Sequence, residues 1–242
     1  MNFELTYKPY GERSILVEWP SEIDKSILYD ILLFSEKLKY CEFRNIMNFN
    51  ISYNSILVVY NVLFDVKDEI KRLQEVYDTH HTLQKKEYRL WKIPVCYDEQ
   101  YGIDLEVLSN EKGLSKLEII KLHSQAYYTV YFIGFLPGFL YLGGLDTSLH
   151  TPRKATPRLK IDKGAVAIGG KQTGVYPSES PGGWHVIGNS PISFFNPSKE
   201  EPCFAKPGDA IKFFPVTLKE YELIKTLVSH GVYNLESEVI ID

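Results

Sequence analysis

The chain has 242 residues, of which 44% are hydrophobic, so it can form one large domain or two modest ones and is not expected to be disordered. A formal charge of −4 excludes nucleic acid or an anionic membrane held by bulk positive charge. The three cysteines have no paired spacing, and no signal sequence or membrane span is apparent, so we expect a cytoplasmic protein whose partners are small molecules or other proteins.

Hydrophobic patterning in the first part of the chain predicts strands and two helices. The strands are expected over residues 3–7, 14–19, 43–51, 55–60 and 88–95. An apolar stripe predicts a helix over 22–39, and Asp65 is the expected N-cap of a second helix. This order of elements is typical of a ferredoxin-like α/β sandwich, so we predict an N-terminal α+β domain over residues 1–95.

Two neighbouring histidines, His80 and His81, follow the second predicted helix. Adjacent histidines on a helix point in different directions, and no cysteine or carboxylate pair completes a ligand set. We therefore interpret them as a solvated helix end, and we predict no metal site in the chain.

The remaining residues, 96–242, are predicted to form a second, β-rich domain. Ser115 with Glu118 and Thr217 with Glu220 are capping boxes, each of which marks the start of a helix. A weaker helix is expected over residues 104–110. Short strands are expected over residues 127–133, 185–188, 192–195 and 210–214, with an edge strand within 232–241. Short strands between turns are typical of a barrel or a sandwich.

Glycine is concentrated in one stretch, because eleven of the 16 glycines lie between Gly134 and Gly188. Such density weakens regular helix and strand. Two interpretations stay open: the glycines supply tight turns in a β-rich domain, or they let backbone amides approach a ligand.

Two arginines in this stretch, Arg153 and Arg158, each follow a proline. Their planar guanidinium groups suit carboxylate or phosphate, and the alternative is that they clamp carboxylates of the protein's own loops. Gln172, Thr173 and Tyr176 offer neutral donors and acceptors, for a small amide, lactam or carboxylate or for stabilising a turn.

Three other side chains are ambiguous. Trp184 could floor a pocket or plug the end of a barrel. His123 is expected to be a half-buried structural residue, and His185 is not favoured as a catalytic base. No phosphate-loop, nucleophile-elbow or dinucleotide-binding pattern is present.

Several long motifs nonetheless occur in one characteristic order. They are residues 131–146, the Pro-Arg pairs at 152–153 and 157–158, and residues 164–170, 172–177, 180–184 and 207–209. In these motifs the sequence resembles the family that contains the B-type subunit of 5-oxoprolinase (PxpB), the kinase inhibitor KipI and the protein long labelled allophanate hydrolase subunit 1. The resemblance is strong from His123 to Phe214 and holds only in outline before residue 95.

The resemblance implies an N-terminal α/β domain over 1–95 and a C-terminal cyclophilin-like β-barrel over 96–242. It also implies a PxpB-like hydrolase subunit, inactive alone, that works with PxpC-like and PxpA-like subunits to open the lactam of 5-oxoproline to glutamate using ATP. The alternatives are a KipI-like inhibitor of a histidine kinase and a carboxyltransferase-type subunit of a urea carboxylase or allophanate system, in which biotin would be the cofactor.

Under this resemblance, positive and neutral donors would hold an activated lactam. The candidate catalytic residues are Arg153, Arg158, Gln172 and Tyr176. The candidate substrate-binding residues are His123, Phe135, Pro137, Gly138, Gly169, Gly170, Thr173, Pro177, Gly182, Gly183 and Trp184.

Overall fold

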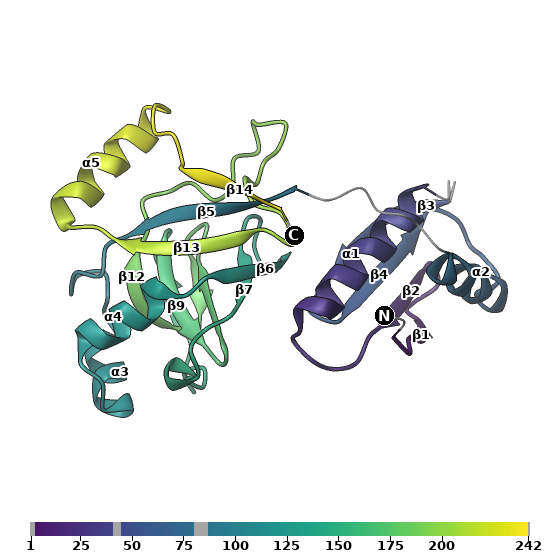
Figure 1. Ribbon diagram of the computed structural model, residues 1–242, viewed down its shortest axis with the longest axis horizontal. Coiled ribbons are helices and arrows are strands. Elements are labelled where there is room, and N and C mark those ends of the chain that lie inside the picture. The colour runs from purple at the N-terminus through teal and green to yellow at the C-terminus, as the bar shows by residue number, and fades with distance from the viewer. Residues whose placement is uncertain (1–2, 41–44, 80–86, 242) are drawn as a thin grey trace. The chain divides into compact units, whose positions relative to one another are not determined.

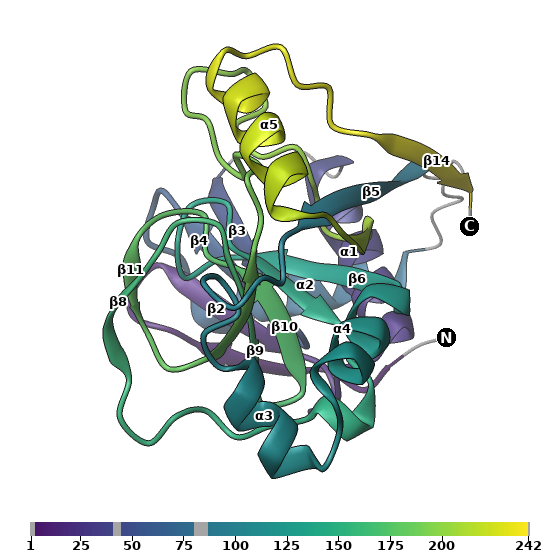
Figure 2. The ribbon, with the colours of Figure 1, turned by 90° about the vertical axis from the view of Figure 1, so that its left-hand side faces the viewer.

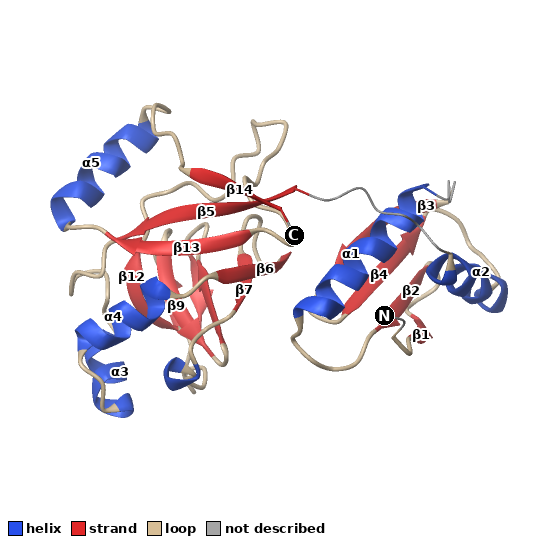
Figure 3. Ribbon diagram, viewed as in Figure 1, coloured by secondary structure: helices blue, strands red, loops and turns tan. Residues whose placement is uncertain are grey.

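The computed structural model describes residues 3–40, 45–79 and 87–241 (Figure 1). The chain divides into two compact units, residues 1–86 and residues 87–242. Both units are mixed α/β structures, as Figure 3 shows by its colours. Among the described residues, no helix combines the length and the apolar character that crossing a membrane requires.

The first unit contains an antiparallel sheet with the strand order β1-β2-β4-β3. Its strands are β1 (Thr6–Pro9), β2 (Ser14–Glu18), β3 (Ile46–Ile51) and β4 (Ser55–Tyr60), and its helices are α1 (Lys25–Tyr40) and α2 (Val66–Asp78). Strands β2 and β4 bury alternate residues, and these side chains pack with apolar residues of both helices in one core. The first strand starts later than expected, at Thr6.

The start of α2 is as predicted. The carboxylate of Asp65 accepts hydrogen bonds from the backbone N–H groups of Lys67 and Asp68, which would otherwise lack partners at a helix start. His80 and His81 lie outside the described residues, so their predicted place at a solvated helix end remains a prediction.

The second unit contains an eight-stranded sheet with the order β12-β9-β10-β7-β6-β13-β5-β14. Its strands are β5 (Glu87–Val95), β6 (Tyr128–Ile133), β7 (Leu140–Gly143), β9 (Ala165–Gly169), β10 (Gln172–Val175), β12 (His185–Asn189), β13 (Ala210–Pro215) and β14 (Ser237–Ile241). A two-stranded ribbon of β8 (Arg158–Ile161) and β11 (Ser180–Gly182) stands apart from this sheet (Figure 2). The edge strand expected near the end of the chain is β14, and this prediction is confirmed.

The helices of the second unit are α3 (Leu105–Lys112), α4 (Lys116–Gln125) and α5 (Leu218–Ser229), with a short 3-10 turn at Thr147–Leu149. Both predicted capping boxes are present, Ser115 with Glu118 before α4 and Thr217 with Glu220 before α5. Helix α4 packs against β13, and α3 lies beside the start of β12.

The predicted boundary at residue 95 places one strand in the wrong unit. Strand β5 pairs in parallel with β13 from Leu90 to Val95 and antiparallel with β14, so it belongs to the second sheet. In the first unit, the edge position beside β2 is taken by β1. The boundary therefore precedes Glu87.

Two further expectations fail in the second unit. The described strands do not form a closed barrel, because β12 and β14 lie at opposite ends of the strand order. Two hydrogen bonds between Cys96 and Asn189, each 2.9 Å long, nevertheless join the end of β12 to the end of β5. Residues 192–195 form no strand, although Ile192 and Phe194 are buried.

Candidate functional site

An open hollow of about 500 Å³ lies in the second unit, beside α3. It is lined by Val107, Glu111, Thr151, Pro152, Arg153, Lys154, Ala155, Thr156 and His185. Most of these residues belong to the irregular segment 151–156. Paired backbone hydrogen bonds of 3.0 and 2.6 Å join Thr151 to Gly170, and the N–H of Lys154 donates to the carbonyl of Gly183 at 2.7 Å. These bonds fix the segment to glycines of the main sheet and of the β11–β12 connection.

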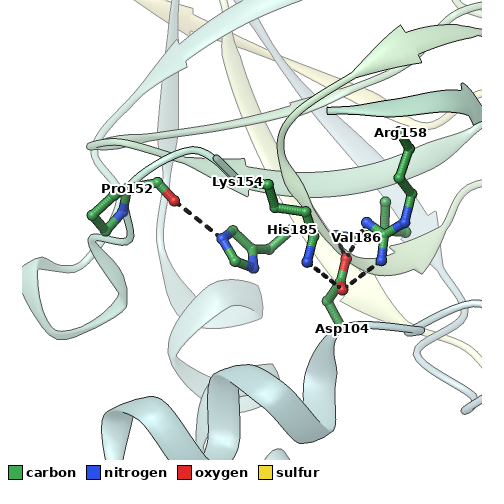
Figure 4. Close-up of polar contacts among 6 residues, drawn as sticks. All are labelled: Asp104, Pro152, Lys154, Arg158, His185 and Val186. Carbon is green, nitrogen blue, oxygen red and sulfur yellow. Dashed lines mark hydrogen bonds and ion pairs between the residues drawn. The ribbon is translucent and has the colours of Figure 1, made fainter. Parts of the chain in front are cut away.

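A buried carboxylate, Asp104, gathers several cations and donors beside the hollow (Figure 4). Both terminal nitrogens of Arg158 donate to its two oxygens, at 2.8 and 2.7 Å. Lys154 Nζ lies 3.0 Å from Oδ1, and the backbone N–H of Val186 donates to Oδ2 at 2.7 Å. Only 2% of the Asp104 side chain is exposed. Asp104 thus joins α3 to β8, β12 and the 151–156 segment.

The electrostatics of this cluster favour the ionised carboxylate. Burial alone raises the pKa of Asp104, but the donors from Arg158, Val186 and Lys154 outweigh it and hold that pKa below its ordinary value. The same contact raises the pKa of Arg158. Of the two roles considered for Arg158, the structure shows the clamp on the protein's own carboxylate, so this guanidinium is already occupied.

Arg153 differs from Arg158, because its side chain is exposed and lines the hollow. Its guanidinium carbon lies 5.8 Å from the centre of the Trp184 ring, within the range of a cation–π contact. Among the residues that the structure describes, no carboxylate forms an ion pair with it. Arg153 is therefore the cation of the hollow that remains open to a ligand.

His185 is a buried polar side chain of the hollow, with 6% of its surface exposed. Its Nε2 lies 3.0 Å from the carbonyl oxygen of Pro152 (Figure 4). A carbonyl can only accept, so in the neutral ring Nε2 carries the hydrogen and Nδ1 is an acceptor. Within the described part of the chain, Nδ1 has no hydrogen-bond partner.

Tyr176 and Trp184 do not line the hollow but belong to one small core cluster. Both are almost fully buried in a small core with Phe139 and Ile161. Burial is the main reason that the pKa of Tyr176 is raised, and a backbone hydrogen bond to Trp184 partly opposes it. Trp184 thus fills the interior of this small core.

The glycines around these two rings make space for them. A Cβ at Gly169 would lie 2.5 Å from the Trp184 ring, and one at Gly182 would lie 2.3 Å from the Tyr176 hydroxyl. At these two positions, glycine is therefore explained by aromatic packing rather than by a tight turn or a ligand.

His123 is fully buried rather than half-buried. It lies in a chain of hydrogen bonds: Tyr97 donates to Nδ1 at 2.7 Å, Nε2 donates to Thr173 at 2.8 Å, and Thr173 donates to the Ala167 carbonyl at 3.1 Å. Burial lowers the pKa of His123 to about 3, so the ring is neutral at physiological pH. A side chain without exposed surface cannot contact substrate, and its role is structural.

The other candidate residues also lie outside the hollow. They are Gln172, Phe135, Pro137, Gly138, Gly170, Thr173, Pro177 and Gly183. Gln172 is half-buried at the start of β10. Phe135 is exposed in the turn between β6 and β7, where its φ of 62° is the one positive value at a described residue other than glycine.

Neither Asp104 nor Lys154 is predicted from the sequence. An aspartate just before a helix normally caps it, but Asp104 makes no side-chain capping bond. Its partner Arg158 lies 54 residues later, so no local sequence pattern predicts this ion pair. The lysine between the two Pro-Arg pairs was a usable signal, because it places a third cation in one short segment.

No set of three or more histidine, cysteine or acidic side chains in the described part of the chain is arranged to hold a metal ion. The hollow instead combines one free guanidinium, one buried acceptor nitrogen and the exposed apolar side chain of Val107. Such a set suits a small organic acid that carries a hydrogen-bond donor.

Comparison with known proteins identifies relatives of this chain both by sequence and by structure. A B-type subunit of 5-oxoprolinase from Escherichia coli O157:H7 is 47% identical over 148 residues, which cover 61% of this chain and 67% of that protein. A B-type subunit of 5-oxoprolinase from Haemophilus influenzae is 34% identical over 205 residues, 85% of this chain and 95% of that protein.

The urea amidolyase of Kluyveromyces lactis shares the fold, with a TM-score of 0.85 and 20% identity. The match covers 99% of this chain but 16% of that much longer protein. Residues 5–205 also match the family model described as carboxyltransferase domain, subdomain C and D. The chain therefore belongs to this carboxyltransferase-domain family, together with the B-type subunits of 5-oxoprolinase.

Proposed function

We propose that this chain is the B-type subunit of an ATP-dependent 5-oxoprolinase, which opens the lactam of 5-oxoproline to glutamate together with partner subunits. The observation that carries the proposal is the 34% identity to the corresponding 5-oxoprolinase subunit of Haemophilus influenzae, since that match spans 85% of this chain and 95% of its relative. Relatedness over whole subunits favours a shared role in the assembly.

The partners proposed are PxpC-like and PxpA-like subunits, in the cytoplasm, where ATP is available. The hollow does not fit a nucleoside triphosphate. Of its cations, Lys154 is paired with Asp104 and only Arg153 is free within the described residues, while Glu111 adds a negative charge. We therefore place the nucleotide on a partner subunit.

We also propose a finer description of the fold. The first unit is a ferredoxin-like layer in which β1 takes the place of the missing strand, and the second is an open form of a cyclophilin-like barrel. The bridge between Cys96 and Asn189 supports the second point, because it joins the two sides of the eight-stranded sheet near its ends.

The test is co-expression of this chain with the candidate partner subunits, followed by measurement of glutamate released from 5-oxoproline. Release that needs ATP, and that stops when any one subunit is omitted, supports the proposal. This chain alone is expected to be inactive. An assembled complex that forms no glutamate with ATP present contradicts it.

The alternatives have less support. The similarity to urea amidolyase is at 20% identity, which shows the fold alone, so a biotin-dependent carboxyltransferase role is less favoured. A KipI-like inhibitor would lower autophosphorylation of a histidine kinase without any partner subunit, and the same purified chain can be tested for that effect.

A further inference from the structure

The hollow beside α3 holds a buried histidine nitrogen that the fold itself does not use. His185 Nδ1 is an acceptor without a partner among the described residues, in a ring held by its bond to Pro152. A buried polar atom without a partner is costly, and native proteins rarely retain one that no ligand or water satisfies. Because the side chain of His185 lines the open hollow, a ligand in the hollow is the candidate partner of Nδ1.

The nature of the ligand's donor follows from the state of the ring. Nε2 donates to a carbonyl, so the neutral ring offers a lone pair at Nδ1. The complementary group on a ligand is an N–H or O–H. An amide N–H is such a donor, and it cannot lose its hydrogen at neutral pH.

The second anchor is Arg153. Its guanidinium lies over Trp184, the residue before His185, and it forms no ion pair with a carboxylate in the described part of the chain. Arginine binds carboxylates through two parallel hydrogen bonds. Glu111 in the lining disfavours a ligand of high negative charge, so a single carboxylate fits better than a polyphosphate.

We infer that the hollow binds a small cyclic amide acid, with its ring N–H donated to His185 Nδ1 and its carboxylate held by Arg153. Val107, which is exposed in the lining, contacts the apolar edge of the ring. The inference rests on the proposed function in one respect: 5-oxoproline has this combination of lactam N–H and carboxylate, so the hollow is proposed as the substrate's site on this subunit.

The test pairs three ligands with three variants. The ligands are 5-oxoproline, 2-pyrrolidinone, which lacks the carboxylate, and 5-oxotetrahydrofuran-2-carboxylate, in which oxygen replaces the N–H. Their dissociation constants are measured with the full chain and with the assembled complex, and KM is measured for turnover by the complex. The unaltered protein should bind 5-oxoproline about tenfold more tightly than either analogue, since each analogue loses one polar contact.

His185→Gln places an amide near the position of Nε2, so it can keep the bond to Pro152 while it removes the acceptor at Nδ1. His185→Gln should bind 5-oxoproline no more tightly than 5-oxotetrahydrofuran-2-carboxylate, so the preference for the N–H is lost. It should still bind 5-oxoproline more tightly than 2-pyrrolidinone, so the preference for the carboxylate is retained. His185→Asn, which restores an acceptor near Nδ1, should recover part of the first preference. Arg153→Gln should show the opposite pattern, with loss of the carboxylate preference alone.

Arg13→Gln, at an exposed arginine of the first unit, is the matched control and should change neither preference. If the complex opens 5-oxoproline while His185→Gln and Arg153→Gln keep its KM and both preferences, the inference is wrong and the proposed function stands. If both preferences depend on these residues but no ATP-dependent glutamate forms, the site stands and the proposed function fails. Absence of binding to chain and complex at millimolar ligand also overturns the inference.

Discussion

Asp104 shows at the scale of one residue how a buried charge is stabilised. Replacing it by asparagine keeps the shape but removes the charge that Arg158, Lys154 and the Val186 N–H satisfy. We expect Asp104→Asn to lower the free energy of unfolding at pH 7 by about 2 kcal/mol, less than for a fully buried pair because Arg158 is partly exposed. Urea denaturation measures this, with exposed Asp162→Asn as a control that should change stability little.

The pH dependence of the same variant gives a second measurement. The folded pKa of Asp104 lies below its ordinary value of 3.8, so its contribution is complete above pH 3.8 and is lost as the pH falls below it. The stability gap between the unaltered protein and Asp104→Asn should shrink as the pH falls from 3.8 towards the lower folded pKa. A gap that stays constant over this range contradicts the assigned ion cluster.

His123 predicts a different pH range. Its pKa falls from the ordinary 6.5 to about 3 in the fold, so below pH 6.5 the unfolded chain takes up a proton that the folded chain does not. Stability should therefore decrease by up to about 1.4 kcal/mol for each pH unit below 6.5. His123→Gln should be less stable at pH 7 yet lose less on acidification, whereas the exposed His230→Gln should keep the original slope.

Residue type alone predicted part of the candidate site. Arg153 was identified as a cation suited to a carboxylate, and it does line the hollow. Residue type did not decide whether Arg158 binds a ligand or a carboxylate of the protein, because its partner Asp104 lies on another element. Residue types show what a side chain can bind, and the fold decides which of them are already engaged.

At the scale of single elements, β9 tests the packing role of glycine. A Cβ at Gly169 would lie 2.5 Å from the Trp184 ring, closer than atoms approach in folded proteins. Gly169→Ala should lower the free energy of unfolding by about 1–3 kcal/mol. Gly134→Ala, whose nearest contact would be 3.4 Å away, is the control and should cost less. Equal stabilities of the two variants in urea denaturation would refute the packing role.

The elements best predicted from the sequence are those defined by neighbours in the chain. Both capping boxes join residues three positions apart, so the helix starts follow from the sequence directly. Residues 192–195 show the limit of this reasoning. Their apolar alternation is real, since Ile192 and Phe194 are buried, but Pro191 and Pro197 flank the segment and lack the N–H groups that a sheet needs.

At the scale of the whole molecule, the position of β5 predicts which fragments fold. Strand β5 lies between β13 and β14, and its Ile93 and Val95 are fully buried in the core of the second unit. A fragment of residues 87–242 should therefore fold alone, whereas a fragment of residues 96–242 should not. Circular dichroism and urea denaturation of the two fragments decide this, and equal cooperativity in both would contradict the boundary before Glu87.

The division into two units was predictable, but its boundary was not. Strand β5 follows α2 in the chain, and its own residues would suit either sheet. Its partner β13 is far away in the sequence, so no local pattern reveals the pairing. The same holds for the open sheet, because short strands and turns look alike in open and closed arrangements.

The parallel pairing of β5 with β13 also has a consequence for how the chain is made. The hydrogen bond from Arg89 to Asp209 spans 120 residues, so β5 leaves the ribosome on the order of 10 s before its partner does. During that interval the first unit can complete its own fold, while β5 has an unpaired backbone and apolar side chains. The newly synthesised strand β5 is therefore the segment of the nascent chain that we expect a chaperone to bind.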